Sequence, residues 1–81
     1  MPNYRMDIKG DLGLSEYSNI FDYMGIVDTE DTFTITLEEF KKEDLKMITS
    51  MLKGNNFQIV KEGIGRSGDY YINANKELIF K

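Results

Sequence analysis

The chain has 81 residues, 41% of them hydrophobic and 30% charged, with a formal net charge of -4 at pH 7. This length excludes a core that also encloses a deep catalytic cleft, and the composition excludes an intrinsically disordered chain. Because the sequence contains no cysteine and no histidine, disulfide bonds, thiol nucleophiles, the commonest general base and the commonest transition-metal ligands are also excluded. We therefore expect a single non-enzymatic domain over residues 1–81, with no cofactor and no metal ion.

The first third of the chain predicts a strand and then a helix. Apolar and polar residues alternate from Tyr4 to Ile8, which indicates a strand with one buried face that is closed by Gly10. From Leu14 the apolar spacing changes to three and four, which predicts an amphipathic helix with Ser15 as its cap and Gly25 at its end. Its apolar stripe comprises Leu14, Tyr17, Ile20, Phe21 and Met24.

The middle of the chain repeats this order. Residues 32–37 alternate threonine with a large apolar residue, which predicts a strand with one polar face. A second helix has its body at residues 45–52 and ends at Gly54, with Lys53 in its last turn. Its start stays open, because a capping-box pattern places it at the end of the strand, whereas Glu43 and Asp44 are typical of a first turn that begins later.

The last third predicts a β-meander. Residues 57–62, 69–73 and 77–80 have strand patterns, and they are joined by a glycine-rich segment at 63–68 and a short turn at 74–76. The order β-α-β-α-β-β indicates an α+β two-layer sandwich with both helices on one face of a small sheet. The predicted core comprises Tyr4, Met6, Ile8, Ile20, Phe21, Phe33, Ile35, Leu45, Ile48, Leu52, Phe57 and Ile59. The predicted solvent-facing side of the sheet comprises Arg5, Asp7, Lys9, Thr32, Thr34, Thr36, Gln58, Val60, Tyr71 and Asn73.

Two further features predict a cytoplasmic protein. The sequence contains no stretch of about 18 apolar residues, which a membrane-spanning helix would need. A small domain without cysteine is also more typical of a reducing compartment than of the outside of the cell. We therefore expect a cytoplasmic location and no contact with a membrane.

Charge is distributed unevenly along the chain. Between Gly10 and Lys41 there are eight carboxylates and no lysine or arginine, whereas the remaining residues carry ten basic and six acidic side chains. An acidic surface without counter-charges attracts a basic surface and speeds the encounter with it. The densest part of this stretch comprises Asp28, Glu30, Asp31, Glu38 and Glu39.

These five acids predict a contact surface for a basic protein partner. Size, charge and the lack of catalytic residues are typical of a regulatory module, such as a phage-encoded or mobile-element inhibitor that occupies the nucleic-acid site of a larger protein. The alternative is that the acidic stretch only keeps a small protein soluble. The oligomeric state stays open, because edge strands in so small a sheet allow pairing by sheet extension.

A second functional hypothesis comes from residues 45–73. Here a helix is followed by the strand pattern Asn55–Gly63, a glycine-rich tip that contains Arg66 and Ser67, and the strand pattern Tyr70–Ile72. This order resembles the recognition helix, strand, wing and strand of winged-helix transcription regulators. The resemblance covers little more than a third of the chain, and residues 37–44 would have to supply the preceding helix and turn.

The winged-helix resemblance implies binding to DNA. In such a complex, the recognition helix faces a groove and the wing tracks the phosphates. The groove-facing residues would be Lys46, Thr49, Ser50 and Lys53. The phosphate contacts would be Lys61 and Arg66.

Overall fold

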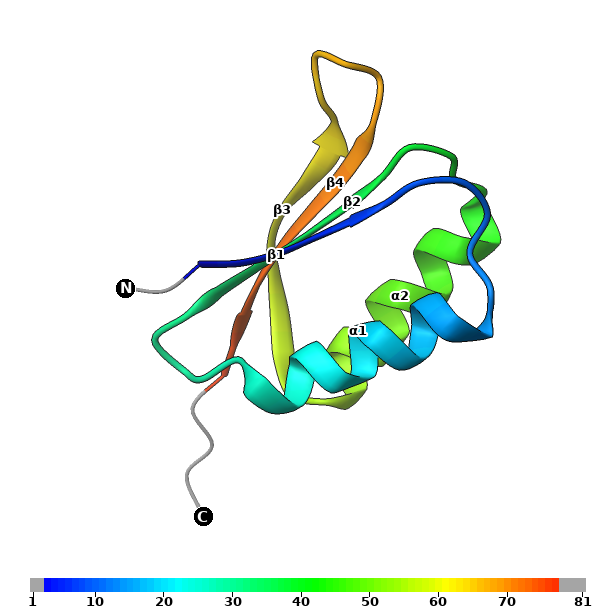
Figure 1. Cartoon of the computed structure of the whole chain (residues 1–81). Helices are drawn as coiled ribbons and strands as arrows, with labels where there is room; N and C mark the ends of the chain where they lie inside the picture. Colours follow the sequence, from blue (N-terminus) through cyan, green and yellow to red (C-terminus); the bar gives the residue numbers. More distant parts are fainter. Residues whose placement is uncertain (1–2, 78–81) are drawn as a thin grey trace.

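The computed structural model describes residues 3–77. In it, four strands form one mixed sheet and two helices cover one face of that sheet (Figure 1). In chain order the elements are β1 Asn3–Ile8, α1 Leu14–Ile26, β2 Thr32–Leu37, α2 Lys42–Gly54, β3 Phe57–Ile64 and β4 Tyr70–Lys76. The strands lie in the order β1-β2-β4-β3, with β1 and β2 parallel and the other two pairs antiparallel. The predicted α+β two-layer sandwich is therefore confirmed.

Helix α1 begins two residues earlier than its predicted cap would place it. Its N-cap is Gly13, whose backbone N–H donates to Oε1 of Glu16 at 2.7 Å. Ser15 therefore lies inside the first turn, and its prediction as the cap was wrong. A carboxylate in this position satisfies one of the free N–H groups and also interacts favourably with the positive end of the helix dipole.

Helix α2 takes the later of its two predicted starts. It begins at Lys42, with Glu43 and Asp44 in its first turn, because the end of the preceding segment is taken up by β2. At the other end, Nδ2 of Asn55 donates to the carbonyl oxygen of Met51 at 2.7 Å, and the next residue, Asn56, has a positive φ of 67°. Asparagine tolerates this left-handed conformation better than most residues, so the Asn55–Asn56 pair stops the helix and starts β3.

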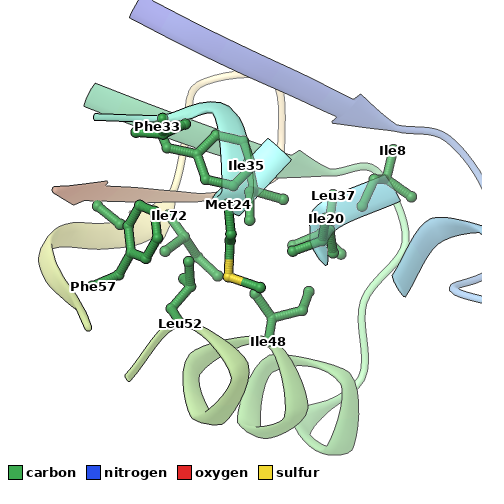
Figure 2. Close-up of a cluster of buried hydrophobic side chains, with 12 residues drawn as sticks. Ile8, Ile20, Met24, Phe33, Ile35, Leu37, Ile48, Leu52, Phe57 and Ile72 are labelled. Carbon is green, nitrogen blue, oxygen red and sulfur yellow. The ribbon is translucent and has the colours of Figure 1, made fainter. Parts of the chain in front are cut away.

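The core lies between the helices and the sheet (Figure 2), and Phe33 on β2 is fully buried in it. The Phe33 ring stacks on Tyr23 of α1, with 5.5 Å between the ring centroids, and meets Phe57 of β3 edge-on at 6.3 Å. Both are favourable aromatic geometries. The buried apolar residues are Ile8, Ile20, Met24, Val27, Phe33, Ile35, Leu37, Ile48, Leu52, Phe57, Ile72 and Ala74.

The core prediction was wrong for Phe21. This side chain is 60% exposed, because α1 is rotated so that Ile20 and Met24 enter the core and Tyr23 covers Phe33. Successive helical residues are about 100° apart, so Ile20 and Phe21 cannot both point at the sheet. Of the other predicted core residues, Tyr4, Met6, Leu45 and Ile59 are half-buried at the margins of the core.

The hairpin between β3 and β4 confirms the glycine-rich turn. At its tip the N–H of Gly65 donates to the carbonyl of Asp69 at 2.8 Å, and Gly68 has a φ of +89°, which favours glycine. By contrast, the turn predicted at residues 74–76 was wrong, because these residues continue β4 and Lys76 pairs with Phe57. The strand predicted at 77–80 lies outside the described residues except for Glu77, which follows the end of β4.

The helices leave one face of the sheet open (Figure 1), and the strand registers place rows of polar residues across this face. One row runs through Arg5, Thr34, Asn73 and Lys61, and Oγ1 of Thr34 donates to Oδ1 of Asn73 at 2.8 Å. In the next row the Thr36 hydroxyl donates to Asp7, and this bond, together with Arg5, lowers the pKa of the Asp7 carboxyl. The polar face was thus predicted well, although an irregularity between Ile59 and Lys61 puts Lys61 in the place expected for Val60.

Tyr70 at the start of β4 should ionise at unusually high pH. Its Oη donates to Oε1 of Glu62 at 2.7 Å, and this hydrogen bond raises the pKa of Tyr70 to about 12. Because the folded pKa exceeds the ordinary value of about 10, the resulting stabilisation is complete below about pH 10 and is lost as the pH rises through 12. NMR titration of the tyrosine Cζ resonances should show this shift, and Glu62→Gln should return the Tyr70 pKa towards the ordinary value. An unchanged pKa in Glu62→Gln would mean that another group holds the proton.

Candidate functional site

The predicted acidic residues lie at two ends of β2 rather than on one surface. Asp28 and Glu30 are exposed in the loop before β2, whereas Glu38 and Glu39 are exposed just after it. A six-residue strand is about 20 Å long. The structure therefore brings Asp28 and Glu30 together and separates them from Glu38 and Glu39.

Asp31 belongs to the loop structure and not to an exposed surface. It is only 7% exposed, and its Oδ2 accepts the backbone N–H of Asp28 at 3.0 Å. Its own N–H donates to the carbonyl of Asp28 at 3.0 Å, and Oδ1 of Asp28 accepts the N–H of Thr29 at 2.7 Å. Asp31 thus closes the turn that leads from α1 into β2, since a short acidic side chain can bond nearby backbone groups.

The outer side of α1 exposes large apolar side chains at both ends of the helix and between them. Leu14 is 83% exposed, and Phe21 and Ile26 are each 60% exposed. Asp22 is also exposed, and it lies with Phe21 and Ile26 within about 140° of the helix circumference. We call this region the α1 surface; it comprises Leu14, Phe21, Asp22 and Ile26 of the helix, with Asp28 and Glu30 of the following loop.

A shallow hollow borders the α1 surface where the carboxyl ends of the two helices lie side by side. Phe21 lines it from α1 and Gly54 from α2, and Lys76 of β4 reaches it from the sheet. The Lys76 ammonium donates to the carbonyl oxygens of Met24 at 3.5 Å and Val27 at 3.3 Å. This contact satisfies the negative end of the α1 dipole, which has no basic residue in its own last turn.

The residues predicted to bind DNA lie on different sides of the molecule. Lys46, Ser50 and Lys53 are exposed on α2, and Oγ1 of the half-buried Thr49 donates to the carbonyl of Lys46 at 3.0 Å. Lys61 is on the open face of the sheet, opposite the helices, and Arg66 is in the hairpin tip. The structure therefore groups the α2 residues and separates them from the residues that were expected to reach phosphates.

The winged-helix resemblance has a matching element order but a different beginning. Helix α2, β3 and β4 follow one another as helix, strand, glycine-rich tip and strand. The segment at 37–44 contains the end of β2, a four-residue link and the first turn of α2, and no separate helix. DNA binding by this region stays a prediction.

Within residues 3–77, no group of three or more acidic side chains is gathered closely enough to bind a metal ion. In the same part of the chain, neither helix has the length and apolar character needed to span a membrane.

Two residues of this region were missed by sequence reasoning. Phe21 was assigned to the core, although the alternative rotation of α1 was available from the same apolar pattern. Lys76 was placed in a turn, and its partners Met24 and Val27 are about fifty positions earlier in the chain, so no local pattern could reveal the contact.

Comparison of this chain with protein-family models, curated proteins and solved structures finds no match in any of the three. A functional assignment has to come from the surfaces themselves. Among residues 3–77, the α1 surface combines exposed apolar side chains with acids on a helix that carries no basic residue.

Proposed function

We propose that this protein is a non-enzymatic protein-binding module that contacts a basic partner through the α1 surface. The observation that carries the proposal is the exposure of Leu14, Phe21 and Ile26 on a helix without a single basic residue. Large apolar side chains that stay in water at 60–83% exposure are a typical mark of an interaction site when they lie close together.

The composition of the α1 surface resembles that of a protein interface. Aromatic and large aliphatic side chains supply most of the affinity once they are buried, and a charged rim sets partner choice and association rate. Phe21 would be the apolar anchor, and Asp22 and Glu30 would belong to the rim. The partner should therefore offer an apolar pocket surrounded by lysine or arginine.

A partner with such a surface would be a protein that handles nucleic acids, since these proteins have exposed basic surfaces. An acidic module bound there would compete with the nucleic acid for the same basic residues. The proposed role is thus that of an inhibitor or regulator of a nucleic-acid-handling protein.

The test compares two charge reversals of equal size, one on the α1 surface and one just after the carboxyl end of β2. The Asp22→Lys/Glu30→Lys variant changes the α1 surface, whereas Glu38→Lys/Glu39→Lys is the matched control after β2. The side chains of these four residues have no hydrogen bond to another described residue, so both variants should keep the fold, which circular dichroism will verify. Tagged wild-type protein and both variants are then used in quantitative pull-downs from the source cell.

We expect the α1 variant to lose a partner that the wild type and the control variant retain. Association of the purified partner should slow by about tenfold or more and become less dependent on salt, because electrostatic steering is screened by ions. Equal capture by both variants would contradict the proposal. Loss of the partner only in the control variant would show that the partner contacts Glu38 and Glu39 instead of the α1 surface.

A further inference from the structure

Strand β1 forms an open edge of the sheet. It pairs with β2 over six residues in an unbroken register, and no other strand of the described chain lies on its far side. Such an edge presents unpaired backbone N–H and C=O groups that can pair with another strand.

The other edge of the sheet is built differently. Strand β3 has an irregularity in its pairing between Ile59 and Lys61, and Lys61 and Glu62 follow it. Bulges and charged residues are devices that keep an edge strand from pairing with another chain. Because β1 has no such break, the two edges are not equally protected.

The sequence of β1 is complementary to itself when two copies run antiparallel. Centred on Met6, this arrangement places Arg5 opposite Asp7 of the second copy, and Asp7 opposite Arg5. Directly opposite residues on antiparallel strands are neighbours on the same face, and opposite charges there stabilise the pair. Tyr4 would lie opposite Ile8 on the helix side, so apolar residues also meet apolar ones.

The charges select this register over its neighbours. Moving the centre by one residue to Arg5 would place the two arginines opposite each other, and moving it to Asp7 would oppose the two aspartates. Both alternatives are unfavourable because like charges directly opposite destabilise a strand pair. Only the register centred on Met6 pairs every charge of the strand with its opposite.

The side chains concerned are accessible. Arg5 and Asp7 have side chains that are 66% and 51% exposed, on the open face of the sheet, and Nε of Arg5 donates to Oδ1 of Asp7 at 2.9 Å. The guanidinium has further N–H groups, so it can bind a second carboxylate without breaking this contact. Tyr4 and Met6 are only half-buried, which leaves apolar surface at this edge for a second copy to cover.

We infer that the protein forms a two-fold symmetric dimer in which the β1 strands of two copies pair antiparallel about Met6 and join the two sheets into one of eight strands. The interface is isologous, because each copy contributes the same strand. It is separate from the interface proposed for the α1 surface, so either can be wrong without the other.

The test is a charge-swap experiment with the full chain, followed by sedimentation equilibrium. The wild type should dimerise from its monomer mass of 9.4 kDa in a concentration-dependent manner. Arg5→Asp opposes two carboxylates across the interface, and Asp7→Arg opposes two guanidinium groups. Each variant alone should therefore show a dissociation constant raised by about tenfold or more.

An equal mixture of the two variants should recover the dimer. In the mixed pair every position again opposes an acid and a base, which a variant that had merely unfolded could not achieve. Lys61→Glu on the β3 edge is the control and should leave the dimer unchanged. A second measurement uses the Met6→Cys variant of this otherwise cysteine-free chain. Because the paired central residues are close enough for a disulfide, we expect this variant to form a disulfide-linked dimer.

Three results would overturn the inference. One is a wild type that stays monomeric at all concentrations measured. Another is a mixture that dimerises no better than its two components, which would exclude the register. The third is assembly beyond the dimer, because the paired β1 edges leave no further copy of this edge to extend.

Discussion

Replacing Phe33 with alanine should lower the free energy of unfolding by about 3–5 kcal/mol. The side chain is fully buried in the core, stacked on Tyr23 and edge-on to Phe57. Its loss removes buried apolar area and leaves a cavity between the sheet and α1. Because domains of this size are stable by only roughly 4–12 kcal/mol, a large part of the total stability would be lost. Urea unfolding followed by circular dichroism measures the change.

The matched control is Phe21→Ala, the same substitution on an exposed position. We expect a loss below about 1 kcal/mol, since surface substitutions rarely cost more. If Phe21→Ala and Phe33→Ala lowered the free energy of unfolding by similar amounts, Phe21 would be buried and α1 would be rotated differently about its axis. A small loss for Phe33→Ala alone would show that the core can close around the missing ring.

The substitution Lys76→Met should lower the free energy of unfolding by about 1–3 kcal/mol. The substitution removes the ammonium group, which donates hydrogen bonds to the carbonyl oxygens of Met24 and Val27. The same group lies 5.9 Å from the centroid of the Phe57 ring. Methionine keeps most of the apolar stem, so the effect isolates the charge. Hydrogen exchange should also become faster for amides in the last turn of α1, because that turn loses its link to the sheet.

Lys53→Met on α2 is the control for Lys76→Met. Lys53 is exposed in the last turn of its helix, and its loss should cost only about 0.3–1 kcal/mol through the helix dipole. Equal losses for the two variants would indicate that the contact between β4 and α1 contributes nothing beyond a general dipole effect.

Local patterns were sufficient to predict the elements that are regular and well bounded. The threonine alternation at 32–37 identified β2 and its buried face, and the Asn55–Asn56 pair identified the end of α2. The same patterns could not decide how α1 is rotated, because its apolar residues at three- and four-residue spacing allow either Ile20 with Met24 or Phe21 to face inwards. In the folded protein Ile20 and Met24 face inwards, and Tyr23 stacks on the ring of Phe33.

Features that depend on non-local pairing were beyond sequence reasoning. The stretch Ala74–Lys76 has turn-like composition, yet it is held in β4 by its pairing with β3 and β2. The acidic residues are close in sequence, but an extended strand moves Glu30 and Glu38 apart, whereas a helix of equal length would have kept them closer. Asp31 was counted among the exposed acids because its backbone partner in the loop has no sequence signature.

The strand order β1-β2-β4-β3 has a consequence for how the protein is made. During synthesis the chain leaves the ribosome from its amino end, so β1, α1, β2, α2 and β3 all emerge before β4. In the sheet that residues 3–77 form, β4 lies between β2 and β3 and is the strand through which the β1-β2 half pairs with β3. The nascent sheet consequently has a gap at its centre until β4 has emerged. The β3-β4 hairpin pairs residues only 6–19 positions apart, whereas the β2-β4 pairing joins residues 33–43 positions apart. Because such long-range contacts form slowly, we expect the pairing of β4 with β2 to be a late step of folding.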